Sequence, residues 1–223
     1  MFAVIFEVQP KPEQWDAYLK IATSLRPALE AIDGFIDNER FASRRTTGKL
    51  LSLSLWRDEK AVVRWRTLAE HHRAQEAGRN AVFADYHLRV GEVSAASALG
   101  VAARLPEQRR DETESGAAKA VTISQFAPVS GDPPLDDLAG RLGLGTASPA
   151  PLGHEVFESI TVPGKMLLLA AWPDGAAASR WRPTSPGTGA LRHLCVRIIR
   201  DYGLADRREA PQYYPPRTPC VST

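Results

Sequence analysis

Residues 41–65 read FASRRTTGKLLSLSLWRDEKAVVRW, and residues 157–181 read FESITVPGKMLLLAAWPDGAAASRW. The two segments align without a gap at a constant offset of 116 residues (157 minus 41), and they share Gly-Lys, Trp-x-Asp and Arg-Trp pairs. The chain has only 5 Trp, so chance does not plausibly align two pairs of them. We therefore interpret the chain as a duplicated domain.

Each copy is expected to alternate strands and helices in the same order. In the first copy, β-branched and alternating apolar residues predict strands over 2–8, 35–43, 50–56 and 83–93. Helical spacing predicts one helix from Pro12 to Gly34, kinked near residues 23–24 by Pro27. It predicts a second helix from Asp58 to Gly78, either continuous or with a break before His71. Strand, helix, strand, strand, helix, strand is the split-βαβ or ferredoxin-like order, an α+β class.

The antiparallel sheet of such a domain has helices on one face only, so its bare face must be buried elsewhere. We expect a ferredoxin-like domain at 1–95, a linker at 96–118, a degenerate second domain at 119–205 and a polar tail at 206–223. The second copy is called degenerate because its helices are shortened by Pro and Gly. The two bare faces are predicted to pack together within one chain, as a monomeric pseudo-dimer or a homodimer of it.

Composition excludes several classes of partner. Of 223 residues, 43% are hydrophobic and 24% charged, with a net charge of +2, which is typical of a globular protein. Nucleic-acid binding is not expected, because basic runs with interleaved aromatics are missing. Membrane association is not expected either, since no apolar run reaches ~18 residues. The N-terminal MFAVIFEV reads as a strand, and with two cysteines, Cys195 and Cys220, a cytoplasmic protein with reduced thiols is expected.

Three residues on the second helix are the candidate catalytic residues. Trp65 is expected on the inward side of this helix, where it would either form part of a pocket wall or pack in the core. His72 follows at position +7 and returns to the face of Trp65 if the helix is regular. His71 is the alternative. Either histidine would act as a proton acceptor near neutral pH or as a haem ligand, or would simply face solvent or cap the helix.

Other polar residues are candidates for binding a substrate. Ser52 and Ser54 share one face of a strand. Arg73, Arg79 and Arg89 are candidates to bind a carboxylate or phenolate, with surface charge as the alternative. The sequence lacks a His/Cys/Asp cluster with ligand spacing and a Gly-rich phosphate loop, so neither a metal nor a nucleotide cofactor is expected. Any active site is expected in the first copy only, because Pro and Gly follow Trp181.

The first copy resembles the antibiotic biosynthesis monooxygenase family of the dimeric α+β barrel superfamily. The resemblance lies in GKLLSLSLWRDEKAVVRW (48–65), EHHRAQEAGR (70–79) and FADYHLRVGEV (83–93), and RDYGLADRREAP (200–211) resembles the segment that follows the last strand in single-domain members. The resemblance implies that two such units pair sheet to sheet. It also aligns His71 with the histidine of the family's EHR-x-AQ pattern.

The resemblance implies a cofactor-independent monooxygenase acting on a flat, polyketide-like aromatic substrate. A haem-binding or haem-degrading monooxygenase is the alternative. Haem is less favoured because haem degraders of this superfamily resemble one another in an Asn on the first strand, and here that strand reads FAVIFEV. The spacing from the helix Trp to the ligand histidine also differs, since the residue ten positions after Trp65 is Gln75. A non-enzymatic ligand-binding or structural protein is the third hypothesis, favoured if Trp65 lies sealed in the core.

Overall fold

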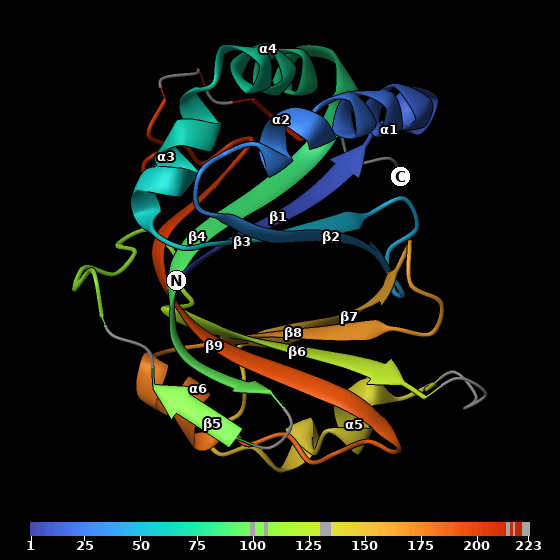
Figure 1. The fold of residues 1–223 in the computed structure, drawn as a ribbon, viewed down its shortest axis with the longest axis vertical. Coiled ribbons are helices and arrows are strands. Elements are labelled where there is room, and N and C mark those ends of the chain that lie inside the picture. Colours follow the sequence, from blue (N-terminus) through green and yellow to red (C-terminus); the bar gives the residue numbers. More distant parts are fainter. Residues whose placement is uncertain (99–100, 105–106, 130–134, 213–214, 216, 220–223) are drawn as a thin grey trace.

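The computed structural model describes residues 1–98, 101–104, 107–129, 135–212, 215 and 217–219, and Cys220 lies outside them. Two β-sheets face each other at the centre, and helices cover the outer face of each (Figure 1). The predicted pair of ferredoxin-like units in one chain is confirmed. Among the described residues no helix is both long and apolar enough to cross a bilayer.

The first copy has the strand order β4-β1-β3-β2, with neighbouring strands antiparallel. Its strands are β1 (Phe2–Pro10), β2 (Phe35–Ser43), β3 (Leu50–Trp56) and β4 (Phe83–Ala98). Gly48 has a φ of 77° in the turn between β2 and β3, a left-handed conformation that glycine adopts without steric cost. The hairpin that the alternation of Leu51, Leu53 and Leu55 predicted is therefore confirmed.

Both helices of the first copy are interrupted. They form α1 (Trp15–Ser24), α2 (Arg26–Glu30), α3 (Glu59–Thr67) and α4 (Ala69–Ala77), followed by a short helical turn at Gly78–Val82. The break before Pro27 was predicted, since proline cannot donate to the preceding turn. Asp58 caps α3 by accepting a hydrogen bond from the amide of Ala61 (2.9 Å). Leu68, with φ −59° and ψ 128°, leaves the helical region and separates α3 from α4.

The second copy repeats the strands and shortens the helices. Its strands are β6 (Ala120–Pro128), β7 (Gly153–Ser159), β8 (Met166–Trp172) and β9 (Gly189–Gly203), in the order β9-β6-β8-β7. Its helical segments are α5 (Leu138–Arg141), Leu144–Thr146 and α6 (Gly175–Arg180). Asp174 caps α6 as Asp58 caps α3, through the amide of Ala177 (2.6 Å). The helices of the second copy are thus shorter than those of the first.

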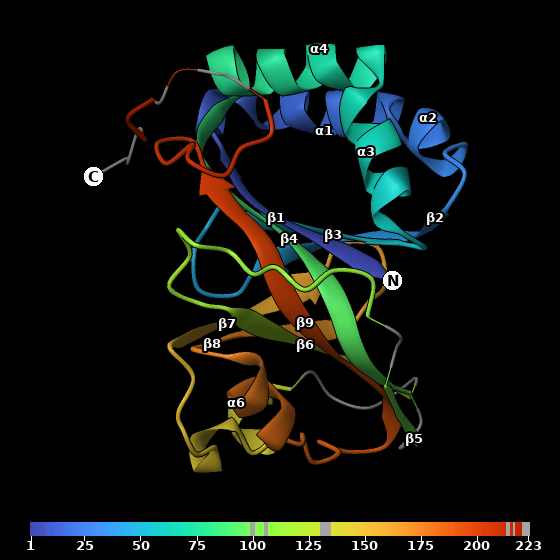
Figure 2. The same cartoon turned by 90° about the vertical axis from the view of Figure 1, so that its left-hand side faces the viewer.

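Two ladders between the copies close the sheets into one barrel of eight strands. β2 pairs with β7, and β4 pairs with β9 along most of its length (Figures 1 and 2). Within the segment expected as a linker, β4 continues to Ala98 and β5 (Val101–Arg104) pairs back onto it. The barrel interior is a buried apolar cluster that includes Ile5, Phe41, Leu53, Ile123, Phe157, Leu169 and Val196. The two ladders pair the strands that would otherwise be sheet edges, and closure buries both bare faces.

The contacts between the copies have an approximate two-fold symmetry. At one end of the barrel Lys49 forms an ion pair with Glu155 (2.6 Å), and at the other Lys165 forms one with Glu39. Ser43 donates to Glu155 (2.5 Å), as Ser159 donates to Glu39 (2.7 Å). Lys49 lies over the Phe157 ring (5.7 Å) and Lys165 over the Phe41 ring (5.9 Å). Each contact therefore occurs twice, the second time between the counterparts of both residues at the offset of 116, as in an isologous dimer interface.

One end of the barrel carries a buried charge network that should make stability depend on pH. Glu7 forms ion pairs with Arg89 and, at 2.7 Å, with Lys49. Burial alone would raise the pKa of Glu7, but Arg89 and Lys49 hold it below the ordinary value of 4.5. A depressed carboxyl pKa adds stability above about pH 4.5 that is lost as the pH falls through the folded-state pKa.

We therefore expect the Glu7→Gln variant to lose less stability between neutral and acidic pH than the wild-type protein. Urea unfolding at a series of pH values measures this, with Glu13→Gln, a change at an exposed carboxylate, as the control. Parallel pH curves for wild type and Glu7→Gln would contradict the assignment of the acid sensitivity to this network.

Candidate active site

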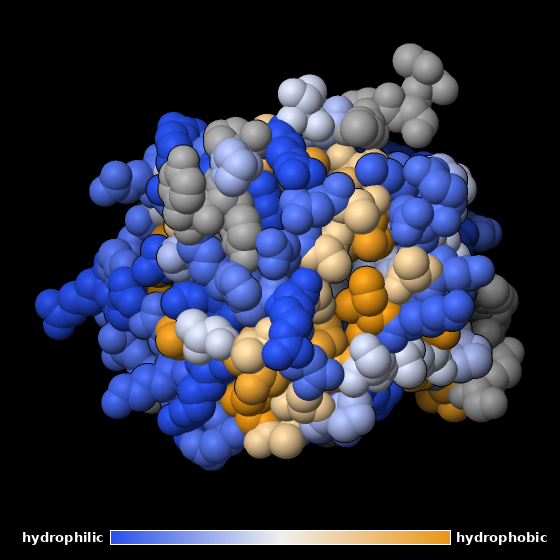
Figure 3. Space-filling view, turned by 90° about the horizontal axis from the view of Figure 1, so that it is seen from above, coloured by the Kyte–Doolittle hydropathy of each residue, from blue (hydrophilic) through white to orange (hydrophobic). Residues whose placement is uncertain are grey.

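A cavity of about 210 Å³ lies between the helices of the first copy and the outer face of its sheet. Most of its wall is apolar, contributed by α1, α2, α3, β1 and β4: Val4, Phe6, Tyr18, Ile21, Leu25, Leu29, Val62, Trp65, Phe83, Tyr86, Leu88 and Val90. Seen from the helical side, apolar side chains reach the surface in a band between hydrophilic flanks (Figure 3). Because Trp65 borders a cavity rather than sealed core, the condition that would favour a purely structural protein is not met.

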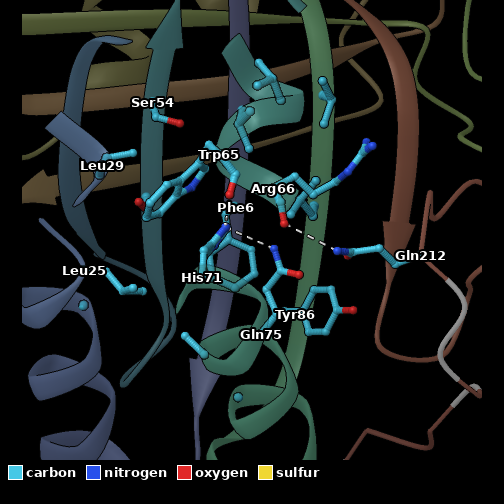
Figure 4. A pocket seen from close by; sticks show the side chains of 18 of the residues that line it. Phe6, Leu25, Leu29, Ser54, Trp65, Arg66, His71, Gln75, Tyr86 and Gln212 are labelled. Carbon is cyan, nitrogen blue, oxygen red and sulfur yellow. Dashed lines mark hydrogen bonds between the residues drawn. The ribbon is translucent and has the colours of Figure 1, made fainter. Parts of the chain in front are cut away.

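His71 and Trp65 form a stacked pair in this wall. Their rings stack, with centroids 4.0 Å apart and an interplanar angle of 16°. His71 Nδ1 lies 2.9 Å from the Trp65 carbonyl oxygen, and because a carbonyl only accepts, Nδ1 carries the proton. The same Nδ1 lies 3.2 Å from Gln75 Nε2 (Figure 4), but with Nδ1 protonated both atoms are donors, so this contact is not a hydrogen bond in the neutral tautomer. The ring therefore keeps Nε2 as a hydrogen-bond and proton acceptor.

Desolvation holds His71 in its neutral form. It lowers the pKa of His71 from 6.5 to about 4, although the hydrogen bond to the Trp65 carbonyl opposes the shift and His72 adds to it. A neutral imidazole with a free Nε2 at the edge of an apolar cavity is able to accept a proton from a bound molecule.

His72 was predicted to return to the face of Trp65, and this is wrong. The +7 count assumed an unbroken helix, but the extended backbone at Leu68 rotates α4 relative to α3. As a result His71 enters the cavity, and His72 is exposed, 3.4 Å from Gln212. The alternative assignment of His71 from the family pattern agrees with the structure.

Ser52 and Ser54 line the cavity, as their shared strand face predicted. Their hydroxyl groups are already engaged with neighbours. Asn38 donates to Ser52 (3.1 Å), and the indole of Trp56 donates to Ser54 (2.9 Å). Each hydroxyl still has its own proton to donate, so both remain able to orient a bound polar group.

Two of the arginines predicted to bind substrate lie elsewhere. Arg73 is exposed on α4 and Arg89 is buried beside Glu7 at the end of the barrel, so neither lines the cavity. Successive residues of a strand point to opposite faces, and Leu88 and Val90 face the cavity, so Arg89 faces the other way. Arg79, the third candidate, does line the cavity and donates to the Tyr86 hydroxyl (2.6 Å).

Sequence reasoning missed the residues that reach this cavity from the second copy. Arg200 and Tyr202 come from β9, and Arg207 and Gln212 from the tail that follows it. Arg207 donates to the Tyr86 hydroxyl (2.6 Å) and lies over the Tyr202 ring (5.1 Å). The arginine-rich run RDYGLADRREAP (200–211) was the available signal, but its position depends on the β4–β9 ladder. Arg40, Arg66 and Gln75 from the first copy were also missed.

The corresponding region of the second copy is filled by side chains. Trp181, the counterpart of Trp65, is buried against Trp172 (5.8 Å) and His193 (5.3 Å). His193 Nδ1 lies 2.8 Å from Ser124, and desolvation lowers its pKa to about 4. The leucines Leu138, Leu142 and Leu144 pack into the same core. The described part of the chain contains no group of three or more His, Cys, Asp or Glu side chains placed to hold a metal ion.

Comparison with known proteins identifies the family of this chain. The family model "Antibiotic biosynthesis monooxygenase" matches residues 1–77. A jasmonate monooxygenase of Pyricularia oryzae is 48% identical over 221 residues, covering 97% of this chain and 99% of that protein. A crystal structure of an aldoxime dehydratase in complex with butyraldoxime shares the fold, with a TM-score of 0.56, 11% identity and coverage of 89% of this chain and 79% of that one. The chain therefore belongs to the antibiotic biosynthesis monooxygenase family.

Proposed function

We propose that this protein is a monooxygenase that oxidises a small, mainly apolar molecule of the jasmonate type, a cyclic ketone with a carboxylate, in the cavity of the first copy. The observation that carries the proposal is the neutral His71 stacked on Trp65 at the wall of an apolar cavity. Its support from outside the chain is the jasmonate monooxygenase with which it shares 48% identity over nearly the full length of both proteins.

This substrate class replaces the flat polyketide-like aromatic that the family resemblance implied. The relative is named for jasmonate, which is not a polycyclic aromatic. The size of the cavity supports the same change, because about 210 Å³ lies below the roughly 300–1,000 Å³ of common ligand pockets. A space of this size suits a small substrate better than a polycyclic ring system or a porphyrin.

The residues suggest a role for His71 as proton acceptor. Nε2 would take the proton of the C–H bond being oxidised, and O2 would add to the resulting carbanion to give, after return of the proton, a hydroperoxide. Reduction of the hydroperoxide to the alcohol and water needs two electrons, which we assign to an external reduced nicotinamide. Trp65 and the apolar wall would exclude water from the carbanion.

The test is incubation of the purified protein with jasmonate under isotopically heavy O2, analysed by mass spectrometry. We expect one heavy oxygen atom in the product when a reduced nicotinamide is present, with no haemin added. Label that appears only after addition of haemin would move the assignment to the haem-dependent alternative. Failure to label jasmonate under any of these conditions would overturn the proposed substrate class.

A further inference from the structure

We infer that Arg66 of α3 and Arg200 of β9 together bind the carboxylate of the substrate, so that the second copy supplies half of an anion site in the cavity of the first. The identity of the carboxylate as jasmonate-like rests on the proposed function. The chemistry of the site requires only a small amphipathic carboxylate. This gives the second copy a role beyond covering the sheet of the first.

The charge of the cavity favours an anion. Its described lining contains five arginines and one carboxylate: Arg40, Arg66, Arg79, Arg200, Arg207 and Glu59. Glu59 already forms an ion pair with Arg109 (2.6 Å). The cavity wall therefore holds a surplus of positive charge in mostly apolar surroundings, where an unpaired charge is costly and a bound anion is strongly attracted.

Among the residues that the structure describes, Arg66 and Arg200 are the arginines of this wall that form no hydrogen bond or close ion pair with another side chain. Arg66 Nε is buried and finds no hydrogen-bond acceptor in the described part of the chain. Arg200 lines the cavity and forms no ion pair within 4.0 Å in the described part of the chain, although its charge helps to lower the pKa of Asp111. By contrast, Arg79 and Arg207 both donate to the Tyr86 hydroxyl and to backbone carbonyl groups of the C-terminal segment. These hydrogen bonds hold Arg79 and Arg207 in place as part of the wall, so we do not assign the substrate carboxylate to them.

The Arg66 and Arg200 guanidinium groups belong to the lining of the same cavity, and both act on Tyr202. Desolvation, and then Tyr86, raise the pKa of Tyr202 to about 12, while the positive charges of Arg207, Arg66 and Arg200 oppose that shift. In Figure 4 the Arg66 side chain extends toward β9, the strand that carries Arg200. Guanidinium groups bind carboxylates through paired, charge-assisted hydrogen bonds.

Binding in this position also orients the rest of the ligand. Arg66 directly follows Trp65 on α3, and Gln212 from the tail donates to the Arg66 carbonyl oxygen (3.5 Å). A carboxylate held at Arg66 places the apolar body of the molecule against Trp65 and His71 (Figure 4). The oxidised carbon is thereby brought to His71 Nε2, which is the positioning that a proton acceptor needs.

The experiment compares jasmonate with its methyl ester, and octanoate with methyl octanoate, by calorimetry and by oxidation rate. We expect the wild-type protein to prefer each free acid over its ester. Arg66→Gln and Arg200→Gln should each weaken binding of the acids about 10- to 100-fold, the range for a lost hydrogen bond to a charged group. Binding of the esters should stay unchanged. Arg73→Gln removes one positive charge from an exposed site and should change the binding of neither the acids nor the esters.

The outcomes separate this inference from the proposed function. If jasmonate is oxidised and both Gln variants keep the wild-type preference for the acid, the inference is wrong and the function stands. If jasmonate is not oxidised, but the acids bind more tightly than the esters and lose that advantage in the variants, the anion site stands and the substrate assignment is wrong. A wild-type protein that binds acid and ester equally overturns the inference directly.

Discussion

Replacing His71 by alanine should lower kcat/KM for the oxidised substrate by about 10²- to 10⁴-fold, the usual contribution of a positioned general base. The reason is geometric, since Nδ1 is fixed by the Trp65 carbonyl and only Nε2 is left to accept a proton. His72→Ala is the matched control, because the neighbouring histidine is exposed and outside the cavity. Steady-state oxidation rates of the two variants, at equal folded fraction, give the comparison. Equal losses in both variants would show that His71 has no special role.

The pH dependence of the reaction provides a second measurement of the same residue. A proton acceptor works in its unprotonated form, so the rate falls as the pH drops through its pKa. Desolvation lowers the pKa of His71 to about 4, and kcat/KM reports the pKa of the free enzyme. We expect the acidic limb of kcat/KM near pH 4 rather than near the ordinary histidine value of 6.5. A limb at the ordinary value would mean that His71 is solvated or is not the base.

The fold could be predicted from the sequence because its evidence is local and repeated. The hairpin and the helix that follows it occur twice with the same turn glycines and the same capping aspartates, Asp58 and Asp174. Alternation along β4 puts Leu88 and Val90 on the face of the cavity and Arg89 on the other. The proposal that Arg89 binds substrate ignored that alternation, which already placed it on the opposite face from the cavity.

The site was only partly predictable because it depends on two features that local sequence does not encode. The first is the break at Leu68, which has neither proline nor glycine beside it, so nothing in Thr67-Leu68-Ala69 marks the end of α3. The second is the ladder between β4 and β9. It brings Arg200 and Tyr202 to a cavity whose other lining residues lie mostly more than a hundred positions earlier in the chain. Long-range pairing of this kind follows from the closure of the whole barrel rather than from any motif.

The approximate two-fold symmetry of the barrel leads to an expected result for stability. Phe41→Ala and Phe157→Ala should destabilise the protein by similar amounts, about 3–5 kcal/mol each, the usual cost of removing a large buried aromatic side chain. Both rings are fully buried in the barrel interior, and each lies under a lysine of the other copy. Ile36→Ala in β2 and Ile160→Ala directly after β7, both at half-exposed positions, should change stability by only about 0.5 kcal/mol.

Urea unfolding followed by fluorescence and by circular dichroism measures these differences. Because β2 pairs with β7 and β4 with β9, each copy completes the sheet of the other, and we expect both probes to report one transition in every variant. Two separate transitions, with Phe157→Ala shifting only one of them, would mean that the copies unfold independently. If Phe157→Ala lowered the free energy of unfolding clearly less than Phe41→Ala, the second copy would pack more loosely. The interface between the copies would then not be as symmetric as its paired contacts indicate.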